Sequence, residues 1–192
     1  MTHENEEELI RKLKQGSQGA FESLFDKYHK RILAIAWGIT LDREESLEIA
    51  QDVFVSVYQN IHTFRGDSGL MTWMRKITVN ICLNWKRKWI RRLRWSHHSI
   101  DQGEIDHSEL GDPGGVTPEE SYIELEFQHL LMDHVALLPE KMRTVFVLSV
   151  IENLSCQEIA DTLGIKTGTV RSRLHNARRH LSQAIEGIIE GI

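Results

Sequence analysis

The 192-residue chain has few of the residues that build disulfide-stapled or extended folds, with only two cysteines, Cys82 and Cys156, and three prolines. Two cysteines are too few for a disulfide framework or a cysteine-rich zinc site. No uncharged apolar run approaches the ~20 residues that a membrane-spanning helix needs. The acidic N-terminus also lacks the basic-then-apolar order of a signal peptide. Because 41% of the residues are hydrophobic, the chain can bury a core, and we expect a soluble, cytoplasmic protein.

Patterns typical of enzymes are also missing. The sequence contains no glycine-rich phosphate loop, no nucleophile elbow and no paired acid and base. Ten histidines are present, but no two of them have the i, i+4 spacing of a helical zinc site. We therefore expect no catalytic activity, no cofactor, no metal and no small-molecule substrate.

Positive and negative charges are segregated along the chain, although the net charge is only −5. Eight basic and no acidic residues lie between positions 75 and 94, and seven basic residues lie between 141 and 181. The segment between these blocks, 96–140, contains eleven acidic residues and neither lysine nor arginine. One basic run is usually a solvated helix face. Two runs separated by an acidic spacer predict two modules that bind a polyanion.

Apolar residues recur at spacings of three and four through most of the chain, and this period predicts helices. A short helix is expected around 6–15, and longer helices follow, with apolar stripes over 49–61 and from about 70 into the first basic block. The last of these carries Trp73, Ile77, Ile81 and Trp85 four residues apart. Between the short first helix and the stripe over 49–61, another long helix is expected to bury Phe21, Leu24, Phe25, Tyr28, Ile32, Ile35, Ala36 and Ile39.

The periodicity disappears between 96 and 120, where Ser, His, Asp, Gly and Pro accumulate, as is typical of a flexible linker. It returns after 121 with a stripe that Pro139 terminates and a further helix over 141–152. The sequence therefore predicts an all-α fold. Two small helical domains, 1–95 and 121–192, are joined by an acidic flexible linker over 96–120.

The C-terminal part has the pattern of a helix-turn-helix. Ser155 and Glu158 have the spacing of a capping box, and Gly164 is placed to end that helix in the left-handed conformation. A second amphipathic helix begins near Thr167. A helical wheel places its apolar residues on one side; they are Val170, Leu174, Ala177 and Leu181.

The opposite side of this second helix is polar and basic. Such a face can enter the major groove of DNA, where arginine pairs with guanine edges, asparagine pairs with adenine, and flanking arginines neutralise phosphates. The alternative is an ordinary helical hairpin with a basic, solvated face. The polar residues at the centre and on the flanks of this face are Arg171, Ser172, Arg173, His175, Asn176, Arg178 and Arg179.

Several motifs in a fixed order carry a family resemblance over nearly the whole chain. They are EIAQDVF at 48–54, TFRGDS at 63–68, ITVN at 77–80, LPE at 138–140, LSCQEIA at 154–160 and GTVRSRL at 168–174. With these motifs the chain resembles the extracytoplasmic-function sigma factors, promoter-specificity subunits of bacterial RNA polymerase in the sigma-70 family.

The resemblance implies that the first domain binds the polymerase core through Glu48, Gln51 and Asp52. It also implies that this domain melts and recognises the −10 promoter element, with the aromatic-containing loop holding unstacked bases. Taken alone, the same residues fit a solvated face and an ordinary turn. The residues that the resemblance places on the −10 element are Phe64, Arg65, Asp67, Ser68, Arg75, Lys76, Asn80, Asn84, Lys86 and Arg87.

For the second domain the resemblance implies recognition of the −35 element. The implied contacts are Thr169, Arg171, Ser172, Arg173, His175, Asn176, Arg178 and Arg179. The sequence departs from the family's usual residues at Leu70, Thr78, Asn84 and Asn176, and these departures bear on which promoter bases are read.

The partners that the resemblance implies are the bacterial RNA polymerase core, promoter DNA and an anti-sigma factor that is often anchored in the membrane. The sequence leaves open a stand-alone helix-turn-helix regulator, which binds specific DNA without polymerase and usually at a symmetric site. A nucleic-acid-modifying enzyme is a second alternative, against which the missing catalytic patterns count.

Overall fold

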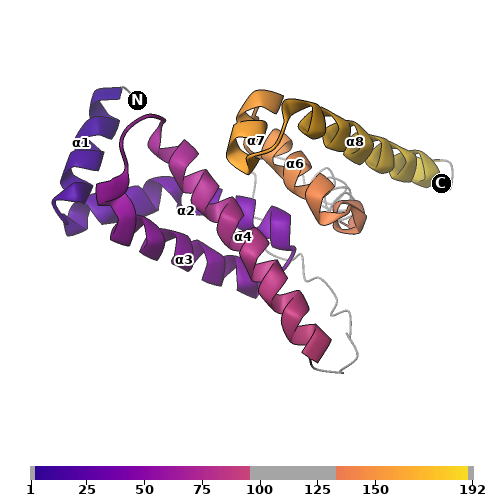
Figure 1. Cartoon of the computed structure of the whole chain (residues 1–192), viewed down its shortest axis with the longest axis horizontal. Coiled ribbons are helices and arrows are strands. Elements are labelled where there is room, and N and C mark those ends of the chain that lie inside the picture. Colours follow the sequence, from indigo (N-terminus) through magenta and orange to yellow (C-terminus); the bar gives the residue numbers. More distant parts are fainter. Residues whose placement is uncertain (1–2, 96–132, 190–192) are drawn as a thin grey trace, which may run out of the picture.

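The structure is a computed structural model that describes residues 3–95 and 133–189, with side chains described over 6–85 and 133–183. Within these ranges the chain is helical apart from turns and loops, and no β-strand occurs in them, so the predicted all-α fold class is confirmed. The helices in chain order are α1 (His3–Lys14), α2 (Gln18–Thr40), α3 (Arg43–Asn60), the 3-10 turn η1 (Ile61–Thr63), α4 (Leu70–Trp95), α6 (Glu140–Val150), α7 (Cys156–Leu163) and α8 (Thr167–Ile189) (Figure 1).

Short local hydrogen bonds fix where the N-terminal helices begin. The Ser17 hydroxyl accepts a hydrogen bond from the N–H of Ala20 at the start of α2. The Asp42 carboxylate accepts one from the N–H of Glu45 at the start of α3. Each cap satisfies an N–H group that has no partner inside its helix. Gly16 makes the turn between α1 and α2 with a φ of 75°, a conformation that glycine adopts without steric cost.

Helices α2, α3 and α4 pack together as the N-terminal unit, and α1 packs against α2 (Figure 1). The predicted burial of the apolar stripe of α2 is mostly confirmed. The prediction is wrong for Phe25, because its side chain is 42% exposed. Phe25 lies about 100° around the helix from Leu24, which places it at the edge of the buried stripe. Leu24 is fully buried, while Phe25 lies on the flank, with its ring stacked on that of His29 at 4.9 Å.

The buried face of α4 is one residue away from the predicted one. Trp73, Ile77, Ile81 and Trp85 are only half-buried, because α4 packs against α7 on one side as well as against α2 and α3. Among the described side chains of α4, those that are buried are Leu70, Met74, Arg75, Thr78, Val79 and Cys82.

The C-terminal unit, α6–α8, contains the predicted helix-turn-helix. At the start of α7, the Ser155 hydroxyl accepts a hydrogen bond from the N–H of Glu158, and the Glu158 carboxylate accepts one from the N–H of Ser155. Gly164 ends the helix with a φ of 63°. The predicted apolar stripe of α8 is confirmed as buried; it consists of Val170, Leu174, Ala177 and Leu181.

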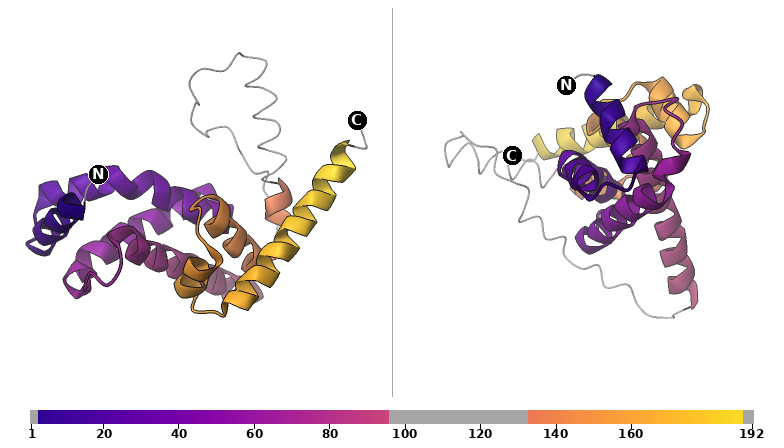
Figure 2. Two further views of the ribbon diagram at one scale, coloured as in Figure 1. Left: turned by 90° about the horizontal axis from the view of Figure 1, so that it is seen from above. Right: turned by 90° about the vertical axis from the view of Figure 1, so that its left-hand side faces the viewer.

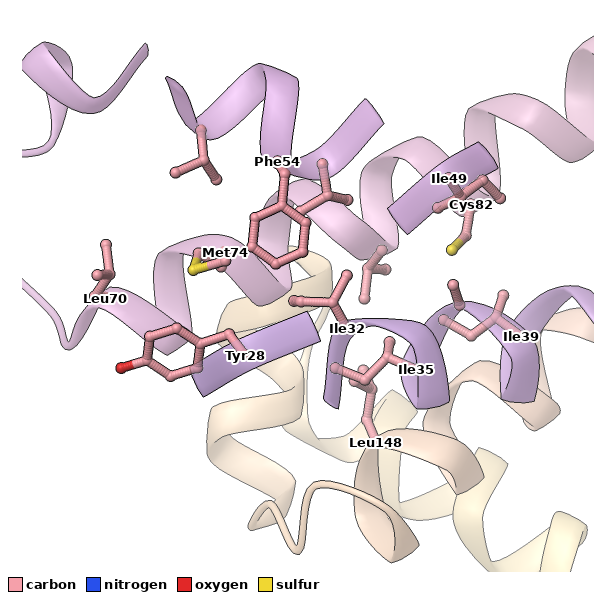
Figure 3. Packing of buried hydrophobic residues seen from close by; sticks show 14 of the residues in the cluster. Tyr28, Ile32, Ile35, Ile39, Ile49, Phe54, Leu70, Met74, Cys82 and Leu148 are labelled. Atoms are coloured by element: carbon pink, nitrogen blue, oxygen red, sulfur yellow. The ribbon is translucent and has the colours of Figure 1, made fainter. Parts of the chain in front are cut away.

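The two helical units share one hydrophobic core, a feature that the sequence did not predict. Helix α6 packs on α2, and α7 packs on α4, whereas α8 extends away from this contact (Figure 2). Leu148 of α6 is fully buried and lies next to Ile35 of α2 (Figure 3). Gly38 of α2 faces Val147, and a Cβ at Gly38 would lie 3.0 Å from both Val147 methyl groups. The contact therefore depends on a residue without a side chain at position 38.

Residues 96–132 lie outside the described residues. The linker expected over 96–120 and the helical stripe expected after 121 fall on this segment and stay predictions. The division of the chain into domains 1–95 and 121–192 also stays a prediction.

Candidate nucleic-acid and polymerase interfaces

The first half of α8 presents a basic face to solvent. Arg171, Ser172 and His175 are exposed, as are Arg178 and Arg179. Of the remaining residues predicted for the −35 element, those on the edges of this face are half-buried; they are Thr169, Arg173 and Asn176. Among the described residues, no acidic side chain forms an ion pair with any arginine of α8. The positive charge of this face is therefore available to a polyanion such as DNA.

Helix α7 holds the start of α8 in place through polar contacts. The Thr167 hydroxyl donates a hydrogen bond to the Gln157 side-chain oxygen at 2.9 Å, which joins the first residue of α8 to the first turn of α7. The pKa of Glu158 is lowered from its usual range because the hydroxyl and N–H of Ser155 donate to its carboxylate. The charged carboxylate therefore fixes the cap of α7, and α7 fixes the direction in which α8 projects.

The three residues predicted to contact polymerase lie on the exposed side of α3, away from its buried stripe. Glu48, Gln51 and Asp52 are all exposed. The sequence interpretation missed the exposed apolar residues of this helix, which include Val55 and Tyr58 at 52% and 60% exposure. Their positions outside the buried stripe could have revealed them. Acidic and apolar groups side by side are suited to a protein partner and would repel the phosphates of DNA.

Hydrogen bonds with side chains of α1 hold the loop between η1 and α4 in place. Lys14 donates a hydrogen bond to the carbonyl of Phe64 at 2.7 Å, and a carboxylate oxygen of Glu6 accepts one from the N–H of Leu70 at 2.8 Å. Phe64, the aromatic residue that the resemblance places on the −10 element, is not accessible in this structure. Phe64 is buried, with its ring centroid 5.3 Å from that of Trp73. The loop residues that are exposed are Arg65, Asp67 and Ser68.

The predicted −10 contacts on α4 are only partly accessible. Asn80 is exposed and Lys76 is half-buried. Asn84 lines a hollow between α3 and α4 together with Glu48 and Asp52, which places it beside the predicted polymerase contact. Arg75 is only 5% exposed, so its expected place on the outer sector of α4 is wrong. The side chains of Lys86 and Arg87, which are also predicted to contact the −10 element, lie outside the described residues.

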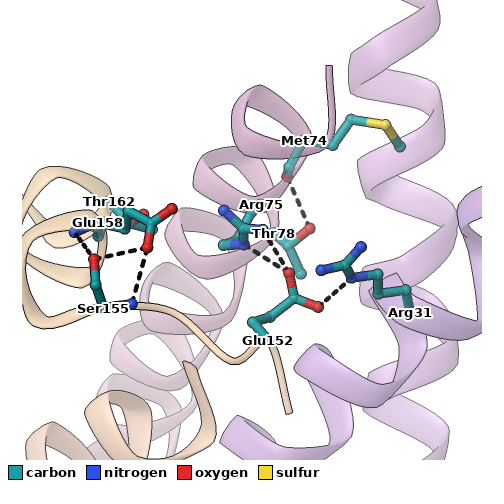
Figure 4. Close-up of polar contacts among 8 residues, drawn as sticks. All are labelled: Arg31, Met74, Arg75, Thr78, Glu152, Ser155, Glu158 and Thr162. Carbon is teal, nitrogen blue, oxygen red and sulfur yellow. Dashed lines mark hydrogen bonds and ion pairs between the residues drawn. The ribbon is translucent and has the colours of Figure 1, made fainter. Parts of the chain in front are cut away.

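Arg75 is buried because it forms an ion pair with Glu152, in the loop between α6 and α7 (Figure 4). One carboxylate oxygen of Glu152 accepts from Arg75 Nε and lies 2.7 Å from both Nε and Nη2. The other accepts from Arg31 Nε of α2 at 2.5 Å. The Glu152 side chain has no exposed surface. A buried carboxylate needs such partners, because transfer of a lone charge out of water costs several kcal/mol.

The described residues hold no group of three or more His, Cys, Asp or Glu placed to bind a metal. Burial raises the pKa of the Cys82 thiol to about 12, so this cysteine is protonated and is neither a nucleophile nor a ligand. Over the same described part of the chain, no helix combines the length and the apolarity that crossing a bilayer requires.

Residues 24–95 match the family described as Sigma-70 region 2, and residues 128–181 match Sigma-70, region 4. The RNA polymerase sigma-H factor of Pseudomonas aeruginosa is 29% identical over 189 residues, with 98% of each chain covered. The ECF RNA polymerase sigma factor SigW of Bacillus subtilis is 30% identical, with 93% of this chain and 96% of SigW covered.

Two solved structures share the fold. The sigma factor RpoE of Bartonella quintana, in complex with the anti-sigma factor NepR, superposes with a TM-score of 0.71 and 17% identity over 86% of this chain and 96% of that one. CnrH, in complex with the cytosolic domain of CnrY, gives a TM-score of 0.64 and 20% identity over 95% of this chain and 97% of that one.

The chain therefore belongs to the extracytoplasmic-function sigma factors of the sigma-70 family. It is an alternative sigma factor that directs RNA polymerase to promoters. Members of this family are transcription regulators and not enzymes.

Proposed function

We propose that this sigma factor reads its promoters with two separate surfaces, α8 for the −35 element and the α4 side of the N-terminal unit for the −10 element. The observation that carries the proposal is the basic face of α8, which is exposed and has no acidic partner among the described residues. A capped helix-turn-helix with such a face inserts its second helix into the major groove.

On α8, Arg171 and Arg173 lie in the first turns, where a recognition helix reaches base edges. Ser172, His175 and Asn176 add neutral donors and acceptors for base contacts. Arginines further along the helix and on its flanks neutralise phosphates. Thr169, Arg178 and Arg179 belong to this group.

For the −10 element, the exposed loop residues Arg65, Asp67 and Ser68 are the proposed contacts of an unstacked base. Phe64 is buried under this loop against Trp73, so its proposed role is to support the loop. Lys76 and Asn80 continue the surface along α4. The remaining proposed contacts of α4 are Arg75, Asn84, Lys86 and Arg87.

For the polymerase core, Glu48, Gln51 and Asp52 form the polar part of the α3 contact, and Val55 and Tyr58 form its apolar part. An apolar centre with charged neighbours is the usual composition of a protein–protein interface. The protein acts in the cytoplasm, where polymerase is found, and catalyses no reaction itself.

We also propose an anti-sigma factor as a partner. Both solved relatives were obtained with a protein bound to the sigma factor, NepR in one and CnrY in the other. A protein that covers α3 or α8 of this chain would block polymerase or promoter binding, respectively. Because CnrY is represented by its cytosolic domain, a membrane-anchored inhibitor is one form that this partner can take.

Run-off transcription on fragmented genomic DNA tests the proposal, with purified core polymerase and this protein free of inhibitor. We expect new start sites that share two upstream motifs. A variant with both Arg171→Ala and Arg173→Ala should lose these starts while still co-purifying with core polymerase. If the double variant gives the same start sites as the wild type, α8 does not read the −35 element and the proposal is wrong.

A further inference from the structure

The C-terminal unit covers part of the surface proposed to bind the −10 element. Arg75 belongs to that surface, but its side chain is 6% exposed, and its guanidinium donates to Glu152 from a segment 77 positions away in sequence. Carboxylate and phosphate oxygens accept the same charge-assisted hydrogen bonds from arginine. As long as Glu152 occupies this position, Arg75 cannot contact a DNA phosphate.

Arg31 and Arg75 together form an anion-binding site. The two guanidinium groups come from α2 and α4 and bind the two oxygens of one carboxylate, at 2.5 and 2.7 Å (Figure 4). Arg31 keeps 47% of its side chain exposed, so the site lies at the edge of the contact between the two units. Removal of Glu152 would leave two neighbouring positive charges that solvent and anions can reach.

The rest of the contact is close-packed but imperfectly satisfied. Val147 fits against Gly38, and Arg143 of α6 donates a hydrogen bond to the carbonyl of Ile39 at the end of α2, at 3.4 Å. The Nε group of Arg143 is buried and has no acceptor among the described residues. An unmet buried donor weakens a contact.

We propose that this chain has a closed state, the one seen here, in which Glu152 occupies an anion-binding site that a backbone phosphate of promoter DNA occupies in an open state. The inference rests on the proposed role of α4 in promoter binding. Glu152 acts as an internal mimic of the phosphate, and the C-terminal unit competes with DNA for Arg31 and Arg75. DNA then binds only the open fraction of molecules, which lowers its apparent affinity by that fraction.

Two variants of the full chain open this contact by independent means. Glu152→Gln removes the charge that both arginines bind. Gly38→Leu places a side chain against Val147 without changing any charge, in a helix that leucine favours over glycine. Their matched controls are Asp161→Asn, which removes a charge from an exposed site on α7, and Gly19→Leu, at a glycine of α2 with open space around it.

The first measurement is the radius of gyration of each full-length variant by small-angle X-ray scattering, with circular dichroism to verify that helicity is retained. We expect a larger radius for Glu152→Gln and Gly38→Leu and no change for the two controls. This readout does not involve DNA or polymerase, so it tests the closed state even if the proposed promoter function fails. An unchanged radius in both opening variants would overturn the closed state.

The second measurement is fluorescence anisotropy with a labelled fork-junction DNA that carries a −10 motif found by run-off transcription. If about one wild-type molecule in thirty is open, both opening variants bind this DNA about thirtyfold more tightly. Adding Arg31→Ala to Glu152→Gln should lower that affinity by about threefold or more, because a phosphate contact is lost. Equal affinity in wild type and opening variants would refute competition. An unchanged affinity on adding Arg31→Ala would refute the shared anion site.

Discussion

Helices α4 and α8 carry the same chemical signature but differ in how much of it is available. Each has arginines on a sector that the sequence places away from an apolar stripe. On α8, Arg171, Arg178 and Arg179 are exposed and have no acidic partner among the described residues. On α4, Arg75 is buried against Glu152. A count of basic residues therefore gives the capacity of a helix to bind DNA and does not give its accessibility.

The difference has its origin in long-range packing. The polar face of α8 points away from the shared core, and among the described helices its buried stripe packs mainly on α6 and α7. Helix α4 is contacted from two sides, by α2 and α3 and by α7. One residue from the C-terminal unit, Glu152, is therefore enough to hold Arg75, a proposed DNA contact, in an internal ion pair. Availability on α4 depends on docking, and availability on α8 does not.

The largest expected effect comes from removing the buried arginine. Arg75→Ala leaves the Glu152 carboxylate buried with one partner, and we expect a loss of about 2 kcal/mol in the free energy of unfolding. Undocking limits the loss, because it hydrates the carboxylate. Urea denaturation followed by circular dichroism measures the change. Arg171→Ala is the matched control, because an exposed arginine contributes within about 0.5 kcal/mol. Equal losses in the two variants would remove the distinction between α4 and α8.

The second-largest effect is expected for Arg171 of α8, and it is a loss of DNA binding and not a loss of stability. Arg171→Ala should weaken binding to a −35 duplex by about tenfold, or about 1.4 kcal/mol, as expected for one base or phosphate contact. Fluorescence anisotropy at fixed salt measures it. Gln183→Ala, at an exposed position later on α8, serves as the control and should leave the affinity unchanged. If Arg171→Ala binds as tightly as wild type, the reading face of α8 lies elsewhere.

The features that the sequence could predict are local ones. The capping box of Ser155 and Glu158, the left-handed Gly164 and the apolar stripe of α8 each depend on residues a few positions apart. The exposed, basic side of α8 follows directly from that stripe. This is why the fold class and the layout of the helix-turn-helix agree with the prediction.

The features that the sequence could not predict depend on contacts between distant segments. The partners of Glu152 lie 121 and 77 positions away, so nothing near Glu152 marks it as a buried anion. The burial of Phe64 depends on Trp73 and on α1, which holds the loop through Lys14. The shift in the buried face of α4 depends on α7, which approaches a side that the helical period alone leaves free.

Helices α4 and α8 also differ in how they are held in place, and the smallest expected effect comes from this difference. Helix α4 is fixed by the shared core, whereas α8 is fixed partly through the local cap of α7. Ser155→Ala removes that cap and should cost about 1 kcal/mol in the free energy of unfolding. Ser23→Ala is the control, because Ser23 only donates back to the Gly19 carbonyl within α2 and alanine favours a helix. A loss for Ser23→Ala as large as that for Ser155→Ala would show that the cap is not responsible.

The pH dependence of the same variant separates the cap from a simple loss of the serine side chain. The Ser155 hydroxyl, followed by its N–H, holds the pKa of Glu158 below its ordinary value of 4.5. A carboxyl group with a lowered pKa in the folded protein stabilises that state fully above its unfolded pKa. The stabilisation is lost as the pH falls through the lowered folded value. The difference in stability between wild type and Ser155→Ala should therefore be constant near neutral pH and shrink below about pH 4.5. A difference that grows on acidification would mean that the Glu158 carboxylate opposes the cap, and α8 would then owe its position to the core alone, as α4 does.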